Sequence, residues 1–119
     1  MSWYLRQAED GKADVAYFLG LQYERGIRRG GAEQARRWFE EAARRGHPQA
    51  AFRIAADLWP GDGNATPEDA ERARELFAVA SGGGLAQAAY NLAVMAERGA
   101  GGQIDLEIAD AAYRKAARG

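Results

Sequence analysis

The chain has 119 residues, of which 47% are hydrophobic and 28% are charged, and its formal net charge is −1. This length predicts one domain, and the near-neutral charge argues against nucleic acid as the main partner, because nucleic-acid-binding domains usually carry a strongly basic face. The chain has no cysteine, which excludes a disulfide framework and thiolate chemistry.

Seven helices are predicted along the chain, beginning with a short one over residues 2–9. Apolar residues then recur at helical spacing, as in Ala35, Phe39 and Ala42, which fall at i, i+4 and i+7. They define three antiparallel helix pairs. The first members, called A helices, are expected over roughly 12–25, 48–58 and 85–98, and the second members, called B helices, over roughly 32–45, 67–80 and 106–117. No segment alternates with a period of two residues, so no strand is expected.

The residues at the ends of these segments are typical of helix termini. Thr66 followed by Pro67 predicts an N-cap and a first helical residue, and Asp105 is expected to cap the last helix. Gly46 and Gly84 follow B helices and are interpreted as helix stops, since glycine adopts the left-handed C-cap conformation without strain.

The helical pattern also repeats. Gly11, Gly46, Gly84 and Gly119 are 35, 38 and 35 residues apart. Between them, equivalent positions carry similar side chains, namely Leu19, Ile54 and Leu92, then Ala35, Ala73 and Ala109, and then Phe39, Phe77 and Tyr113. A unit of this length cannot bury its own apolar face, so the units are expected to stack on one another.

The start of the chain is in the same register, because Trp3-Tyr4 precedes Gly11 as Trp38-Phe39 precedes Gly46. The first helix is therefore interpreted as the second half of a missing repeat, so the chain is expected to be either a piece of a longer array or a short protein whose first helix acts as a cap. Residues 1–119 are expected to form one repeat domain, divided into a half-repeat at 1–11 and repeats at 12–46, 47–84 and 85–119.

Two segments carry a family resemblance. VAYFLGLQYERG, residues 15–26, and ARRWFEEAARRG, residues 35–46, resemble the two halves of the Sel-one-like repeat, which is related to the tetratricopeptide repeat. The resemblance covers nearly the whole chain. It implies an all-α fold, an α-solenoid of three antiparallel helix pairs plus the N-terminal half-repeat helix, wound as a right-handed superhelix whose A helices line the concave surface. It also implies an adaptor role.

Catalytic and metal-binding chemistry finds little support in these residues. His47 is the single histidine, and a metal site would need further His or Cys ligands, so His47 is interpreted as a loop or helix-initiating residue. Gly82-Gly83-Gly84 follows a helix and lacks the lysine of a phosphate-binding loop. The sequence therefore predicts no enzyme, no cofactor and no metal.

The arginine pairs of the first B helix form a candidate basic stripe. Glu33–Arg37, Glu40–Arg44 and Glu41–Arg45 are each four residues apart, in the favoured order for helical ion pairs. A solvated outer face whose charges compensate one another is therefore expected.

The A helices supply the candidate binding site. Tyr17, Phe52 and Tyr90 are equivalent residues that form either an aromatic row facing a partner or a filling for the seam between A helices. Trp59 stands where the other units carry Glu24 and Glu97, and is interpreted as a partner anchor or as a lid over the long second loop. The predicted concave site consists of Tyr17, Leu21, Glu24, Arg25, Phe52, Ala56, Trp59, Tyr90, Val94, Glu97 and Arg98.

These observations favour a scaffold or adaptor that binds a protein or peptide partner on the concave face. The family resemblance also leaves open an enzyme acting on a cell-wall-related small molecule, and a self-assembling structural module is a further alternative. End-to-end self-association is expected, since nothing in the sequence covers the outer side of Ala109, Tyr113 and Ala116. Neither nucleic acid nor membrane is expected as a partner. No signal-peptide pattern is visible, so the cytoplasm is expected, or the periplasm if a signal peptide was removed.

Overall fold

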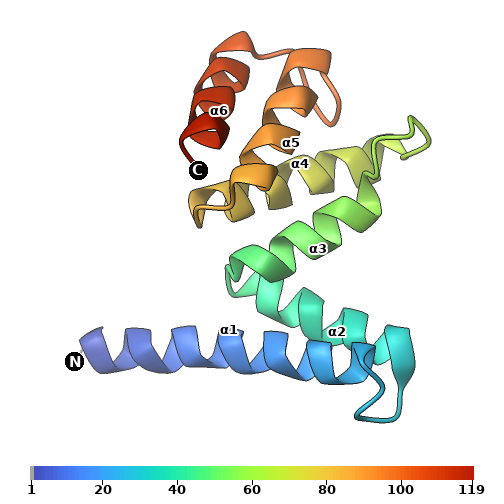
Figure 1. The fold of residues 1–119 in the computed structure, drawn as a ribbon, viewed down its shortest axis with the longest axis vertical. Coiled ribbons are helices and arrows are strands. Elements are labelled where there is room, and N and C mark those ends of the chain that lie inside the picture. Colours follow the sequence, from blue (N-terminus) through green and yellow to red (C-terminus); the bar gives the residue numbers. More distant parts are fainter. Residues whose placement is uncertain (1) are drawn as a thin grey trace.

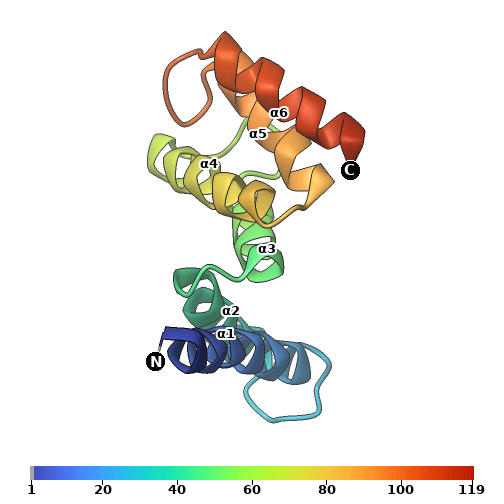
Figure 2. The same cartoon turned by 90° about the vertical axis from the view of Figure 1, so that its left-hand side faces the viewer.

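The computed structural model describes residues 2–119, and the side chains of residues 11–119. It contains six helices, namely α1 (Ser2–Glu24), α2 (Gly31–Arg44), α3 (Pro48–Leu58), α4 (Pro67–Gly82), α5 (Ala86–Arg98) and α6 (Leu106–Arg118). The helices pack in consecutive pairs, which succeed one another from α1 and α2 to α5 and α6 (Figures 1 and 2). No strand occurs in the described part of the chain. The predicted all-α solenoid is confirmed.

The prediction of seven helices is wrong at the N-terminus, where the two expected helices form one, α1, that runs through Gly11. Gly46, its repeat equivalent, has a φ of 84° and is followed by Pro48 at the first position of α3. Gly11 instead precedes Lys12 and Ala13, which are good helix formers, so the helix continues. The expected equivalence of Trp3 and Tyr4 to Trp38 and Phe39 falls outside the described side chains.

The predicted helix starts are confirmed by their capping hydrogen bonds. The Thr66 hydroxyl accepts a hydrogen bond from the Asp69 backbone N–H at 3.1 Å, and the Asp105 carboxylate accepts one from the Ile108 N–H at 3.0 Å. Each side chain satisfies a backbone donor that has no partner within its helix. Helices α4 and α6 therefore begin directly after the residues that the sequence predicted as their N-caps.

The core between the helices consists mainly of alanine. Phe77, Ile54 and Met95 are the largest side chains that are fully buried, and most of the other buried positions are alanines such as Ala42 and Ala73. Small side chains bring the helix backbones close together and leave the few large ones with most of the volume to fill. The stability of the stack should therefore depend on those few large side chains.

Candidate functional site

Each unit contains an aromatic pair that joins its A helix to its B helix. Tyr17 packs on Phe39 with ring centroids 5.5 Å apart, Phe52 on Phe77 at 5.8 Å, and Tyr90 on Tyr113 at 6.0 Å. Offset and edge-on arrangements of this kind are favoured between aromatic rings. The aromatic row on the A helices therefore fixes the pairing inside each unit.

Exposure along this row depends on whether a later unit of the stack covers the ring. Tyr17 is half-buried because His47, at the start of the next A helix, stacks on it with a centroid distance of 4.4 Å. Phe52 is half-buried too, and it packs against the same core cluster as Leu85, the repeat equivalent of His47. Tyr90, in the last unit, is 52% exposed.

Trp59 has a packing role that the sequence did not reveal. Its ring meets the Phe77 ring edge-on at a centroid distance of 6.4 Å, and its side chain is half-buried. Helix α3 ends at Leu58, so Trp59 lies outside the helix, where its repeat equivalence with Glu24 and Glu97 does not indicate what its ring contacts. The residue belongs to the rim of the core and still offers part of its surface to solvent.

The remaining predicted site residues differ in exposure. Leu21 packs against the cluster of Ala35, Phe39 and Ile54, while Ala56 and Val94 are half-buried. The charged members are exposed, and these are Glu24, Arg25, Glu97 and Arg98.

Two of these charged side chains accept hydrogen bonds from residues of neighbouring helices. Glu24 accepts a hydrogen bond from Arg53 at 2.6 Å, and Glu97 accepts one from the Tyr113 hydroxyl at 2.6 Å. The hydrogen bond to Glu97 raises the pKa of Tyr113. Burial would lower the pKa of Arg53, but hydrogen bonds to Tyr17 and Glu24 outweigh it and the pKa is raised.

Sequence reasoning missed Arg53 altogether. Its guanidinium lies 5.0 Å from the centroid of the Phe39 ring, in addition to its ion pair with Glu24. The equivalent residues of the other units are Phe18 and Asn91, so no repeated charge marked this position in the sequence.

His47 initiates α3, as expected from its position after Gly46. Its Nδ1 accepts a hydrogen bond from the Ala50 N–H at 3.2 Å, and its Nε2 lies 3.2 Å from an Asp14 carboxylate oxygen. This arrangement requires a neutral imidazole with the proton on Nε2. Burial lowers the pKa of His47, and the charge and hydrogen bond of Asp14 only partly offset that effect.

This lowered pKa predicts a loss of stability in weak acid. The unfolded chain, with a histidine pKa of about 6.5, binds the proton more readily than the folded one, so the free energy of unfolding should decrease as the pH falls below about 6.5. The slope from this residue is at most about 1.4 kcal/mol per pH unit and vanishes below the folded pKa. Urea denaturation between pH 7 and pH 5 measures it.

His47→Asn is the matched control, because asparagine is a good N-cap that does not titrate. The difference in the free energy of unfolding between the wild type and His47→Asn should be constant above pH 7 and should become smaller as the pH falls into the weakly acidic range. Parallel curves throughout that range would contradict the capping role of the neutral imidazole.

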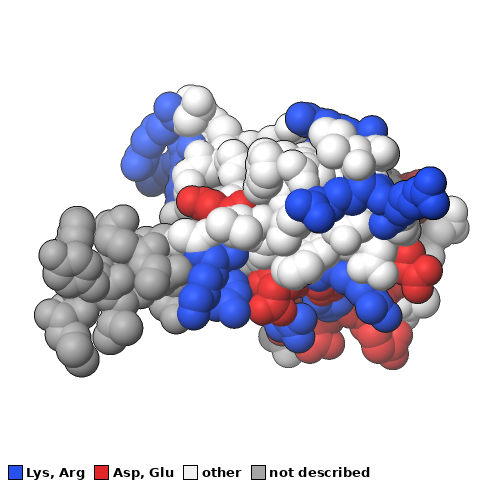
Figure 3. Space-filling view, turned by 90° about the horizontal axis from the view of Figure 1, so that it is seen from below, with Lys and Arg blue, Asp and Glu red and all other residues white. Residues whose placement is uncertain are grey.

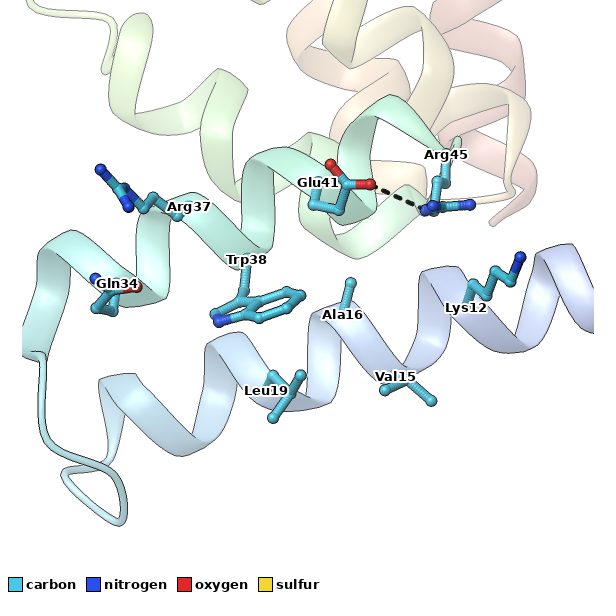
Figure 4. Close-up of a pocket in the computed structure, with 9 residues that line it drawn as sticks. All are labelled: Lys12, Val15, Ala16, Leu19, Gln34, Arg37, Trp38, Glu41 and Arg45. Atoms are coloured by element: carbon cyan, nitrogen blue, oxygen red, sulfur yellow. Dashed lines mark hydrogen bonds and ion pairs between the residues drawn. The ribbon is translucent and has the colours of Figure 1, made fainter.

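A groove that the sequence did not predict lies between α1 and α2, with a volume of about 590 Å³. The Trp38 indole extends from α2 toward Leu19 and Ala16 on α1 (Figure 4). Figure 3 views this end of the molecule, where uncharged surface continues between Lys and Arg side chains. The groove is lined by Lys12, Val15, Ala16, Leu19, Gln34, Arg37, Trp38, Glu41 and Arg45.

Of the three ion pairs predicted along α2, only Glu41–Arg45 is found among the described side chains, and Glu33–Arg37 and Glu40–Arg44 are not. Arg45 pairs with Glu41 at 3.2 Å, as predicted, and Arg44 also pairs with Glu41, at 2.7 Å. Glu40 instead pairs with Arg36 at 3.8 Å and with Arg72 of α4. The last pair joins the B helices of two units, which sequence spacing within one helix could not indicate.

Two features are absent from the described residues. No group of three or more His, Cys, Asp or Glu side chains among them is placed to hold a metal ion. None of the helices they form has the length and apolar character needed to cross a membrane.

Comparison with known proteins places this arrangement in a family. The Sel1 repeat matches residues 13–47, 48–84 and 86–119. A Sel1 repeat protein from Oxalobacter formigenes superposes with a TM-score of 0.77 at 30% identity, over 98% of this chain and 34% of the other.

A second solved structure is c5321, a protective antigen present in uropathogenic Escherichia coli strains that displays an SLR fold. It matches with a TM-score of 0.69 at 28% identity, over 98% of this chain and 25% of its own. This chain thus spans about a third and a quarter of the two relatives. No curated protein matches it. With three matched repeats on a solenoid of paired helices, the chain belongs to the Sel1 repeat family.

Proposed function

We propose that this chain is a non-catalytic adaptor that binds a protein or peptide partner on the face formed by its A helices. Stacked helical repeats present extended surfaces, and such surfaces commonly mediate protein interactions. The proposed face consists of the residues predicted from the sequence, centred on Phe52 and Ala56 of α3, on Trp59 directly after that helix, and on Tyr90 and Val94 of α5.

The observation that carries this proposal is the way the aromatic side chains on this face are held. Phe52 and Trp59 both pack edge-on against the buried Phe77, and Tyr90 packs against Tyr113, yet each keeps part of its surface accessible. A rigid aromatic side chain loses little conformational entropy when a partner binds, which is typical of binding anchors.

A charged blocking substitution tests the proposal without removing the packing. Ala56 is half-buried on α3, and Ala56→Arg should obstruct the face while leaving Phe77 and its aromatic contacts in place. Proteins captured from a lysate by the wild-type chain should be lost with this variant, and the affinity of an identified partner should fall at least about tenfold, as when an interface centre is disrupted.

Ala111→Arg is the matched control, because Ala111 is exposed on α6, a B helix. This variant should retain the partner. Circular dichroism should give the same helical signal for all three proteins. The proposal would be contradicted by a partner that binds the Ala56→Arg variant with the same affinity as the wild type. Loss of the partner only with Ala111→Arg would likewise indicate that the binding surface lies on the B helices.

A further inference from the structure

A small pocket lies where the first unit meets the second, at the end of α1 and between α2 and α3. Its volume is about 170 Å³, which is below the roughly 300–1,000 Å³ of a small-molecule site and suits a single side chain. Its floor is apolar and buried, and is formed by Ala35, Phe39 and Ile54. The other lining residues are Glu24, Ala32, Arg36 and Asp57.

Apolar side chains close the same place at the junction between the second and third units. The repeat equivalents of Glu24 and Asp57 there are Trp59 and Met95. Trp59 packs edge-on against the Phe77 ring, and Met95 is completely buried. Glu24 and Asp57 are both exposed, so the first junction lacks two apolar groups that the second junction has.

The loop that follows the A helix also differs between the two junctions. After α5, the backbone at Gly101 lies directly against Ala70 of α4, which is 7% exposed. After α3, a Cβ added to Gly63 would meet no other described atom within 4 Å, and Ala32, the equivalent of Ala70, is exposed. The pocket is therefore left open by local differences between two junctions that both lie inside the stack.

One charge at the mouth of this pocket is uncompensated. Glu24 pairs with Arg53, and Arg36 pairs with Glu40 at 3.8 Å. The Asp57 carboxylate makes no ion pair or hydrogen bond with any residue that the structure describes. An apolar pocket with one such carboxylate at its rim is complementary to a lysine or arginine side chain, whose methylene groups pack on the floor while its charge stays at the surface.

We propose that this pocket binds a lysine or arginine side chain of the protein or peptide that occupies the A-helix face. The inference rests on the function proposed above, and Glu24 belongs both to that face and to the pocket. The bound side chain takes the place that Trp59 and Met95 have at the second junction. A basic residue is then what distinguishes a partner of this chain from a peptide that only fits the aromatic side chains.

Asp57→Met tests whether the pocket is open. It gives the first junction the residue that is buried at the second, so the variant should melt several degrees above the wild type, as is usual when a cavity is filled. Asp110→Met is the matched control, because Asp110 is exposed on α6, outside this pocket, and should leave the midpoint nearly unchanged. A melting temperature that does not rise with Asp57→Met would overturn the proposal, since the space would then be absent.

Peptides selected from a random twelve-residue phage library against the wild-type chain are the probe for binding. Those that no longer bind Ala56→Arg occupy the A-helix face, and they should share a lysine or arginine at one position. Asp57→Asn should weaken their binding about two- to fivefold, the range for an exposed ion pair. Asp57→Met, which also fills the pocket, should weaken it at least about tenfold. Asp110→Met should bind them as the wild type does.

Exchanging the charges separates this ion pair from a general loss of structure. A selected peptide whose shared basic residue is replaced by glutamate should bind the wild type poorly. The same peptide should regain affinity for Asp57→Lys, because the two charges are again opposite. Equal affinity of the glutamate peptide for the wild type and for Asp57→Lys would overturn the proposed pairing.

The binding results also separate this inference from the function on which it rests. If no selected peptide depends on Ala56, neither the proposed function nor the pocket stands. Peptides that are lost with Ala56→Arg but share no basic residue, or that bind Asp57→Met as tightly as the wild type, would overturn the inference alone. The partner would then bind the A-helix face without using this pocket.

Discussion

Phe77→Ala should lower the free energy of unfolding by about 3–5 kcal/mol, the usual cost of truncating a fully buried phenylalanine. The ring is completely buried and contacts both Phe52 and Trp59, so its removal leaves a cavity where three aromatic side chains meet. A small domain has only about 5–15 kcal/mol of stability in total, and the variant should be close to unfolding at moderate temperature. Urea denaturation followed by circular dichroism measures the loss.

Arg36→Ala is the control on the same kind of helix. Arg36 is exposed on α2 and makes a long ion pair with Glu40 at 3.8 Å, so its removal should change stability by less than about 0.5 kcal/mol. Similar losses for Phe77→Ala and Arg36→Ala would show that the core is not organised around Phe77.

Gly101→Ala should be the second most damaging of these changes, because two costs combine at this residue. Gly101 has a φ of 72°, and a Cβ added to it would lie 2.7 Å from the backbone carbonyl carbon of Ala70 and closer still to its oxygen. The left-handed conformation costs about 1–2 kcal/mol for alanine, and the steric conflict with helix α4 should add about 1–3 kcal/mol. The thermal melting midpoint measures the sum.

The loop that contains Gly101 has little freedom to move away from α4. Arg74 of α4 donates hydrogen bonds to the carbonyl oxygens of Ala100 at 3.2 Å and Gln103 at 3.0 Å. A shift of the loop that relieved the clash would therefore break these hydrogen bonds, and the cost of the substitution cannot be avoided by a small rearrangement.

Gly63→Ala separates the two contributions. Gly63 is the repeat equivalent of Gly101 and has a φ of 82°, but a Cβ there would have no atom within 4 Å. Its substitution should cost only the conformational part, about 1–2 kcal/mol. Equal losses at the two glycines would mean that the loop after α5 does not press against α4 in solution.

The sequence by itself determined the repeat and the helices from α2 to α6, although it did not predict the single long helix α1. Thr66, Asp105 and Pro48 act through hydrogen bonds and dihedral angles within one turn of the chain, and such local effects are visible in sequence. The recurrence of Phe39, Phe77 and Tyr113 likewise placed an aromatic residue of each B helix at the same position in every unit. The role of His47 followed in the same way from its neighbours in the chain.

Only the tertiary structure decided what those residues touch. Gly11 and Gly46 share a repeat position, yet one lies inside a helix and the other ends one, because a glycine permits the left-handed turn without imposing it. The repeat equivalence of Tyr17 and Tyr90 could not show that His47 of the next unit covers the Tyr17 ring, while the Tyr90 ring is exposed.

The same holds for the contacts between units. Arg72 and Glu40 are 32 residues apart, and Trp59 reaches Phe77 only because α3 ends before it. The burial of a side chain and its ion pairs with another unit depend on how the helices pack in three dimensions. The spacing of residues along one helix does not indicate that packing. The groove between α1 and α2 was therefore absent from the sequence pattern and visible only in the fold.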